Sequence, residues 1–144
     1  MIWLVLRIAL MVVGLVEGNE LAFTYQTTLE GLDFAGVLAL VALIAAICVM
    51  LPTTAARWRS GNRGLWHRPG WKGRFLVGEP LQVFHIAAWY FIAMGASGIL
   101  TAIVSRQASV VAPAIVAACG AGALAGAHAY ARLFPRDFTA SEMP

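Results

Sequence analysis

The chain has 144 residues, of which 60% are hydrophobic and only 12% are charged. Soluble domains carry about 25% charged residues, so this composition excludes an ordinary soluble domain and predicts a protein embedded in lipid. The length leaves room for about four membrane spans with short connections. We therefore expect an all-α integral membrane protein, a four-transmembrane-helix bundle, forming a single membrane domain of residues 1–144.

The first apolar stretch, residues 1–20, predicts a first membrane span, with a helix lying along the membrane surface as the alternative. Its first sixteen residues are uncharged except for Arg7, whose long side chain can reach the nearer interface. A secretory signal peptide is not indicated, because the stretch has no basic beginning and no small-residue cleavage site. The connection that follows, residues 17–33, is acidic and contains no basic residue.

The second apolar stretch, residues 34–51, is the clearest span in the sequence. Its 18 residues carry no charge, Asp33 precedes it as a helix N-cap, and Pro52 follows it. Because proline rarely continues a helix, we expect the second helix to end before Pro52.

The second connection, residues 52–80, holds most of the positive charge of the protein. Basic residues in a connection between spans mark the cytoplasmic side, and interleaved tryptophans anchor a segment to lipid headgroups. Basic and aromatic residues together also occur on single-stranded nucleic-acid surfaces, but a segment held to the membrane at both ends favours contact with an anionic cytoplasmic leaflet and no nucleic-acid partner. The predicted membrane-interface anchors are Trp58, Trp66, Trp71, Arg57, Arg59, Arg63, Arg68, Lys72 and Arg74.

Two further spans, residues 81–105 and 110–131, are separated by a tight turn. The basic connection and the basic end of the last span lie on one side of the membrane, and the acidic connection lies on the other. This charge bias predicts that both termini are cytoplasmic. The richness in alanine and glycine and the single lysine, Lys72, are typical of a GC-rich genome, so we expect a multi-pass protein of the bacterial inner membrane.

The fourth span carries small residues at intervals of four, which place them on one stripe of a helix. Small residues allow a second helix to approach closely, which is the usual basis of helix contacts in lipid. The partner helix belongs either to the same bundle or to another subunit. The predicted helix-packing residues are Ala114, Ala118, Gly122 and Gly126.

Two histidines lie near the same end of the third and fourth spans. His85 is about four residues inside the start of one, and His128 is about three residues inside the end of the other. Ionisable residues within spans are candidates for function, and two histidines at equal depth on neighbouring helices can ligate one haem b axially. The alternative is that each ring binds headgroups, water or a backbone carbonyl at the interface.

The third span also resembles a haem-bearing helix of membrane b-type cytochromes, in which an early histidine is followed by aromatic residues and a late Ser-Gly pair. The resemblance covers one span of four and implies that His85 is an axial ligand. The chain departs from such cytochromes because it has no histidine for a second haem at the opposite leaflet. The residues that carry the resemblance are His85, Trp89, Tyr90, Phe91, Ser97 and Gly98.

These patterns favour a small accessory or structural subunit of a larger inner-membrane complex, of respiratory, photosynthetic or secretion type, which acts in assembly or stabilisation. The first alternative is a haem-b membrane anchor that passes electrons to or from quinone. A small oligomeric transporter is the second alternative, although polar groups at mid-membrane are expected for transport and the four predicted spans lack them. No catalytic motif is present, so we expect that the chain is not an enzyme.

Overall fold

The computed structural model describes residues 2–24, 31–59, 71–106 and 108–133. These residues form four helices, α1 (Ile2–Thr24), α2 (Gly31–Arg59), α3 (Trp71–Ser105) and α4 (Val111–Leu133), and the described ranges contain no strand. The all-α class expected from the composition is therefore confirmed.

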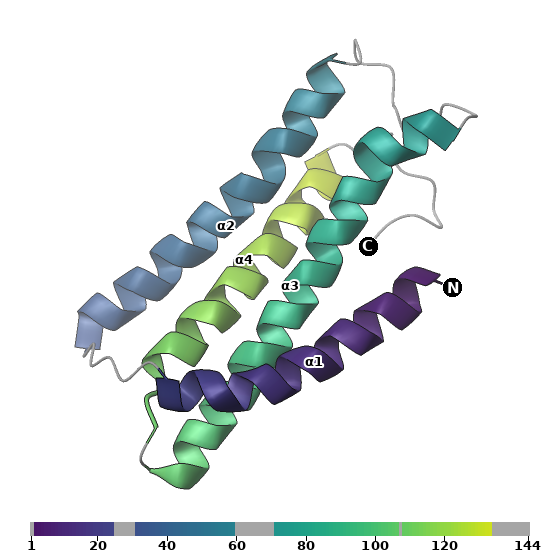
Figure 1. Ribbon diagram of the computed structural model, residues 1–144. Coiled ribbons are helices and arrows are strands. Elements are labelled where there is room, and N and C mark those ends of the chain that lie inside the picture. Colours follow the sequence, from purple (N-terminus) through teal and green to yellow (C-terminus); the bar gives the residue numbers. More distant parts are fainter. Residues whose placement is uncertain (1, 25–30, 60–70, 107, 134–144) are drawn as a thin grey trace.

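The helices stand in a row in the order α1, α3, α4, α2 (Figure 1). The two central helices, α3 and α4, pack against each other, whereas α1 contacts mainly α3 and α2 contacts mainly α4. Helices α1 and α2 lie at opposite ends of this row and do not pack against each other. The four helices therefore form an open row and do not surround a common core.

Three helices are long and apolar enough to cross a membrane, over Asp33–Ala55, Val83–Ser105 and Val111–Tyr130. They correspond to the second, third and fourth expected spans, and they support a multi-pass membrane protein. Among the described helices, α1 does not meet the same criterion. Its apolar sequence is interrupted by Arg7, Glu17 and Glu20.

Helix α1 extends further than the sequence suggested. The expected span ended at about residue 20, and the helix continues to Thr24, whose hydroxyl donates to the Glu20 carbonyl at 2.8 Å. Helix α1 packs closely on α3, because Gly14 and Gly18 lie against the α3 backbone at Tyr90 and Met94.

The expected end of the second helix before Pro52 is wrong, because α2 continues through the proline to Arg59. Proline is tolerated in membrane helices where serine or threonine hydroxyls satisfy the local carbonyls. In α2 the Thr53 hydroxyl lies 2.8 Å from the carbonyls of Val49 and Met50, and the Thr54 hydroxyl lies 2.7 Å from the latter. Much of the expected basic connection, 52–59 and 71–80, is thus helical.

The turn between α3 and α4 is short and tightly packed. Arg106 adopts a positive φ of 53°, which reverses the chain directly after α3. The Ser109 hydroxyl accepts a hydrogen bond from the Val111 amide at 3.3 Å, and the Ser109 amide donates to the Ala22 carbonyl of α1 at 3.1 Å. The turn therefore fixes the end of α1 as well as the start of α4.

Candidate functional site

The two candidate histidines lie side by side at the end of the row where α3 begins and α4 ends. Their ring centroids are 6.2 Å apart and their planes are inclined by 28°. His85 is buried and its Nδ1 atom has no hydrogen-bond partner in the described part of the chain, whereas His128 is exposed and its Nδ1 lies 3.0 Å from the Leu124 carbonyl. A carbonyl only accepts, so this nitrogen of His128 carries the proton.

The surroundings of the pair do not suit a haem. His85 lacks the hydrogen bond that orients a metal-ligating imidazole through its second nitrogen. In addition, α3 and α4 are in backbone contact within two turns of His85, since a Cβ on Gly120 would lie 2.6 Å from the Ala88 carbonyl and 2.9 Å from the Ile92 amide. A porphyrin between the two rings would have to enter where the helix backbones already touch. Haem ligation by His85 and His128 therefore forms no part of the function proposed below.

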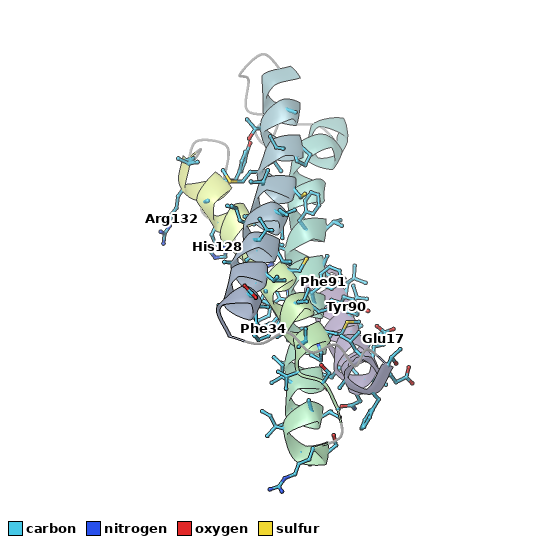
Figure 2. All side chains as sticks on the ribbon, turned by 90° about the vertical axis from the view of Figure 1, so that its left-hand side faces the viewer. Glu17, Phe34, Tyr90, Phe91, His128 and Arg132 are labelled. Carbon is cyan, nitrogen blue, oxygen red and sulfur yellow. The ribbon has the colours of Figure 1, made fainter. Side chains whose placement is uncertain are left out.

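A second group of polar side chains lies along the contact between α1 and α3. The Tyr90 hydroxyl donates to the Glu17 carboxylate, and the Ser97 and Thr101 hydroxyls both donate to the Asn19 side-chain oxygen. Figure 2 shows Glu17 and Tyr90 together on the side of the molecule away from His128. We call Glu17, Asn19, Tyr90, Ser97 and Thr101 the α1–α3 polar face.

This polar face lies well inside the apolar part of α3. Tyr90 is seven residues from the start of the segment Val83–Ser105, or roughly 10 Å along the helix axis. Ser97 lies eight residues and Thr101 four residues from the end of the same segment. Glu17 and Asn19 are both exposed. Two polar side chains of α1 are therefore exposed beside the apolar segment of α3.

The sequence contains a signal for this face that its interpretation missed. Gly14 and Gly18 are four residues apart and let α1 approach α3 so closely that a Cβ on Gly18 would lie 2.2 Å from the Met94 carbonyl. Such small-residue spacing is typical of helix contacts in lipid. Glu17 and Asn19 flank Gly18 in the sequence, so they lie at the two edges of the helix face that contacts α3.

The predicted packing stripe of α4 lies toward α2 in its second half. A Cβ on Gly122 would lie 2.0 Å from the Ala42 carbonyl, and one on Gly126 would lie 2.6 Å from the Ala46 carbonyl. Ala114 and Ala118 are half-buried in the first half of α4. For Gly122 and Gly126, the partner is thus a helix of the same chain.

The predicted interface anchors lie at one end of the row. Arg57, Trp58 and Arg59 form the last turn of α2, and Trp71, Lys72 and Arg74 belong to the first turn of α3. Arg63, Trp66 and Arg68 lie outside the described residues. The backbone therefore places six of the nine anchors beside the end that holds His85 and His128.

Comparison with known proteins adds no identification. No protein-family model, no curated protein and no solved structure matches this chain. Within the part of the chain that the structure describes, no three or more histidine, cysteine, aspartate or glutamate side chains gather as a metal site would require. The features of the chain that bear on its function are therefore the α1–α3 polar face and the end of the row that holds His85 and His128.

Proposed function

We propose that this chain is a small accessory subunit of a larger complex in the bacterial inner membrane, where it acts in assembly or stabilisation. In this proposal the chain crosses the membrane four times, with both termini on the cytoplasmic side. The supporting observation is that Glu17 and Asn19 are exposed beside the middle of an apolar helix.

Exposed polar groups at this depth are unfavourable in lipid. A carboxylate or amide in the hydrocarbon region is costly and almost always faces the protein interior or a polar partner. Tyr90 satisfies one carboxylate oxygen of Glu17, but the carboxylate remains exposed on the outer side of α1. A helix of another subunit that covers the α1–α3 polar face would remove this cost.

The remaining surface of the row suits a lipid-embedded structural subunit. The outward side of α2 exposes large apolar residues along one stripe, which lipid solvates without a partner: Leu40, Leu43, Ile44, Ile47 and Leu51. Helix α1 also exposes large apolar residues, but it carries the exposed Glu17 and Asn19 beside the apolar segment of α3. This asymmetry favours a partner subunit at α1 and lipid at α2.

The proposed partners are the other membrane subunits of a respiratory, photosynthetic or secretion complex, together with anionic lipid of the cytoplasmic leaflet. The basic ends of α2 and α3 would face that leaflet. Neither nucleic-acid binding nor catalysis by this chain alone belongs to the proposal.

Site-specific photo-crosslinking in native membranes tests the proposal. A photoreactive residue replaces Val13, which is exposed one helical turn before Glu17, and the matched control replaces Leu43 on the outward side of α2. We expect Val13 to yield a discrete product heavier than the 15.4 kDa chain, containing a second kind of polypeptide, and Leu43 to yield mainly lipid adducts. The same partner should co-migrate with the chain on native gels.

Two results would contradict the accessory-subunit proposal. Products that are equal at Val13 and Leu43 would mean that the polar face is not the docking side. A Val13 product of twice the mass of the chain would mean that a second copy covers this face.

The second result would favour a small oligomeric transporter, for which the α1–α3 polar face provides the polar groups that transport requires. In an oligomer, copies of Glu17 and Asn19 would line a shared path. Flux measurements on the reconstituted protein, with Glu17→Gln as the variant, would then show a loss of transport. Unchanged flux in the variant would exclude Glu17 from the path.

A further inference from the structure

Three buried side-chain nitrogens at one end of the row have no hydrogen-bond partner among the residues that the structure describes. They are Nε of Arg7 on α1 and, on α3, Nδ1 of His85 and Nε1 of Trp89. Buried polar groups are nearly always hydrogen-bonded, because an unsatisfied group loses its hydration without compensation. Three such atoms at one place indicate that a bound group is needed to satisfy them.

These side chains form one cluster with His128. The His85 ring lies 6.5 Å from the Trp89 ring, edge to face, and 6.2 Å from the His128 ring. Arg7 lies close enough to interact electrostatically with His85, which is only 7% exposed. We call Arg7, His85, Trp89 and His128 the inner cluster, and it joins α1, α3 and α4.

The inner cluster lies at the depth of lipid headgroups. His85 is two residues from Val83, where one candidate span begins, and His128 is two residues from Tyr130, where another ends. The four-span topology proposed above places this end of the row at the cytoplasmic face. The chemistry of the cluster determines which ligand fits it. The proposed topology determines only which leaflet of the membrane would supply that ligand.

The donors of the cluster define the chemistry of their ligand. Arginine and tryptophan only donate hydrogen bonds, and the guanidinium is always charged. The ligand must therefore offer several acceptor oxygens and a negative charge. A neutral carbonyl such as that of a quinone would accept a hydrogen bond but would leave the Arg7 charge uncompensated, whereas a phosphate does both.

We propose that the inner cluster binds the phosphate of an anionic phospholipid, with Arg7 supplying the positive charge and His85 and Trp89 supplying neutral donors. Basic pockets between membrane helices are known to hold anionic headgroups in this way. The lipid tails would lie along α3, on the side between α1 and α4, which contact each other little. His128 packs against His85 and does not bind the phosphate, because its Nδ1 proton is already donated to the Leu124 carbonyl.

Native mass spectrometry of the purified full-length chain in neutral detergent tests the site. The probes are phosphatidylglycerol, which is anionic, and phosphatidylcholine of the same acyl chains, which is zwitterionic. We expect one tightly retained phosphatidylglycerol per chain and at least about tenfold weaker retention of phosphatidylcholine.

Substitutions identify the residues that hold the lipid. Arg7→Gln and Trp89→Phe should each weaken phosphatidylglycerol binding, with a loss of about tenfold or more for Arg7→Gln. Arg106→Gln removes an equal charge at the opposite end of the row and should leave binding unchanged, as should His128→Phe. Arg7→Lys keeps the charge and should retain part of the affinity, which separates loss of binding from loss of folding.

Several results would overturn the proposal. Equal retention of the two lipids would show that no anion site exists. Equal losses in Arg7→Gln and Arg106→Gln would show that general charge attraction accounts for the binding. A third arm adds inorganic phosphate alone, and displacement of phosphatidylglycerol at millimolar phosphate would mean that the site binds the free anion and not a lipid.

Discussion

Gly122 illustrates how single residues set the spacing of the helices. A Cβ at this position would lie 2.0 Å from the Ala42 carbonyl and 2.6 Å from the Ala42 Cα, both of which belong to the α2 backbone. No side-chain movement relieves a contact with backbone, so Gly122→Ala must push α2 and α4 apart. We expect a loss of stability of about 1–3 kcal/mol, the usual cost of overpacking.

Gly36 on α2 provides the matched control, because a Cβ there would meet nothing within 4 Å. Alanine is the better helix former by up to about 1 kcal/mol, so Gly36→Ala should leave stability unchanged or raise it. Equilibrium unfolding in mixed detergent micelles, followed by tryptophan fluorescence, measures both variants. Equal effects of the two substitutions would show that α2 and α4 do not pack through Gly122.

The histidine pair gives a spectroscopic prediction at the same scale. Because α3 and α4 touch at Gly120 and Ala88, we expect no axially ligated haem between His85 and His128. The detergent-purified protein, expressed with ample haem, should show no α band in a reduced-minus-oxidised spectrum. A sharp band that is lost in His85→Ala would contradict this and would restore the electron-transfer alternative.

At the scale of whole elements, the position of α1 is the feature on which the proposed function depends. Its residues Gly14 and Gly18 contact the α3 backbone, and Asn19 accepts hydrogen bonds from α3 hydroxyls. The two helices run in parallel, because residues further along α1 meet residues further along α3. A helix lying flat on the membrane surface would not make this series of contacts.

Disulfide trapping tests the packing of α1 on α3. In a chain whose native Cys48 and Cys119 are replaced by alanine, Asn19→Cys combined with Ser97→Cys should cross-link readily on mild oxidation. The side-chain oxygens at these positions are 3.1 Å apart, within the reach of a disulfide after small adjustments. Mass spectrometry of the digested protein identifies the linked peptides.

Val16→Cys combined with Ser97→Cys is the control, since Val16 is 63% exposed on the outer side of α1. We expect little cross-linking from this pair. Similar yields from the two pairs, or no product from either, would mean that α1 does not hold the orientation described here.

The bounds of some helices were easier to predict from the sequence than those of others. Uncharged runs of span length were sufficient to identify the apolar parts of α2, α3 and α4, because hydrocarbon thickness imposes that length. The ends of α1 and α2 were misplaced for local reasons. Glu17 and Glu20 suggested a connection although α3 hydroxyls and close glycine contacts stabilise a helix there, and Pro52 suggested an end although threonine hydroxyls bind the neighbouring carbonyls.

Site geometry was harder to predict than the helices. The sequence correctly predicted that His85 and His128 lie at the same depth and close together. In two antiparallel helices joined by a short turn, residues equally far from the turn lie at the same level. Depth does not give the distance between helix backbones, which depends on small residues at the contact such as Gly95 and Gly120. For the same reason, the α1–α3 polar face could not be found from the apolar spans taken separately.

At the scale of the whole molecule, the proposed four-span topology can be tested at the N-terminus. Because α1 and α3 pack in parallel, the start of α1 lies at the same end of the row as the start of α3. The basic residues at the end of α2 and the start of α3 also lie at this end. A short protease-cleavable tag at the N-terminus should therefore be cut in inverted membrane vesicles and protected in right-side-out vesicles. This result is expected from four spans with cytoplasmic termini.

A tag inserted within residues 25–30, between α1 and α2, should show the reverse pattern and serves as the control. If the N-terminal tag is cut from the outer side instead, α1 does not cross the membrane and the chain has three spans. The cross-linking result and the vesicle result together distinguish a packed, membrane-crossing α1 from a surface helix.

The order of helices in the row differs from their order in the chain, and this has a consequence for biosynthesis. The first two helices to leave the ribosome, α1 and α2, are not neighbours, and their packing partners α3 and α4 are made last. Helix α2 can remain in lipid without a partner helix because its apolar segment carries no charge. Helix α1 carries Glu17, and its docking surface is completed only when the turn at Ser109 receives the end of α1 at Ala22. Helix α1 is therefore held mainly by α3, and α2, whose main partner α4 follows α3 in the chain, is the helix that settles last.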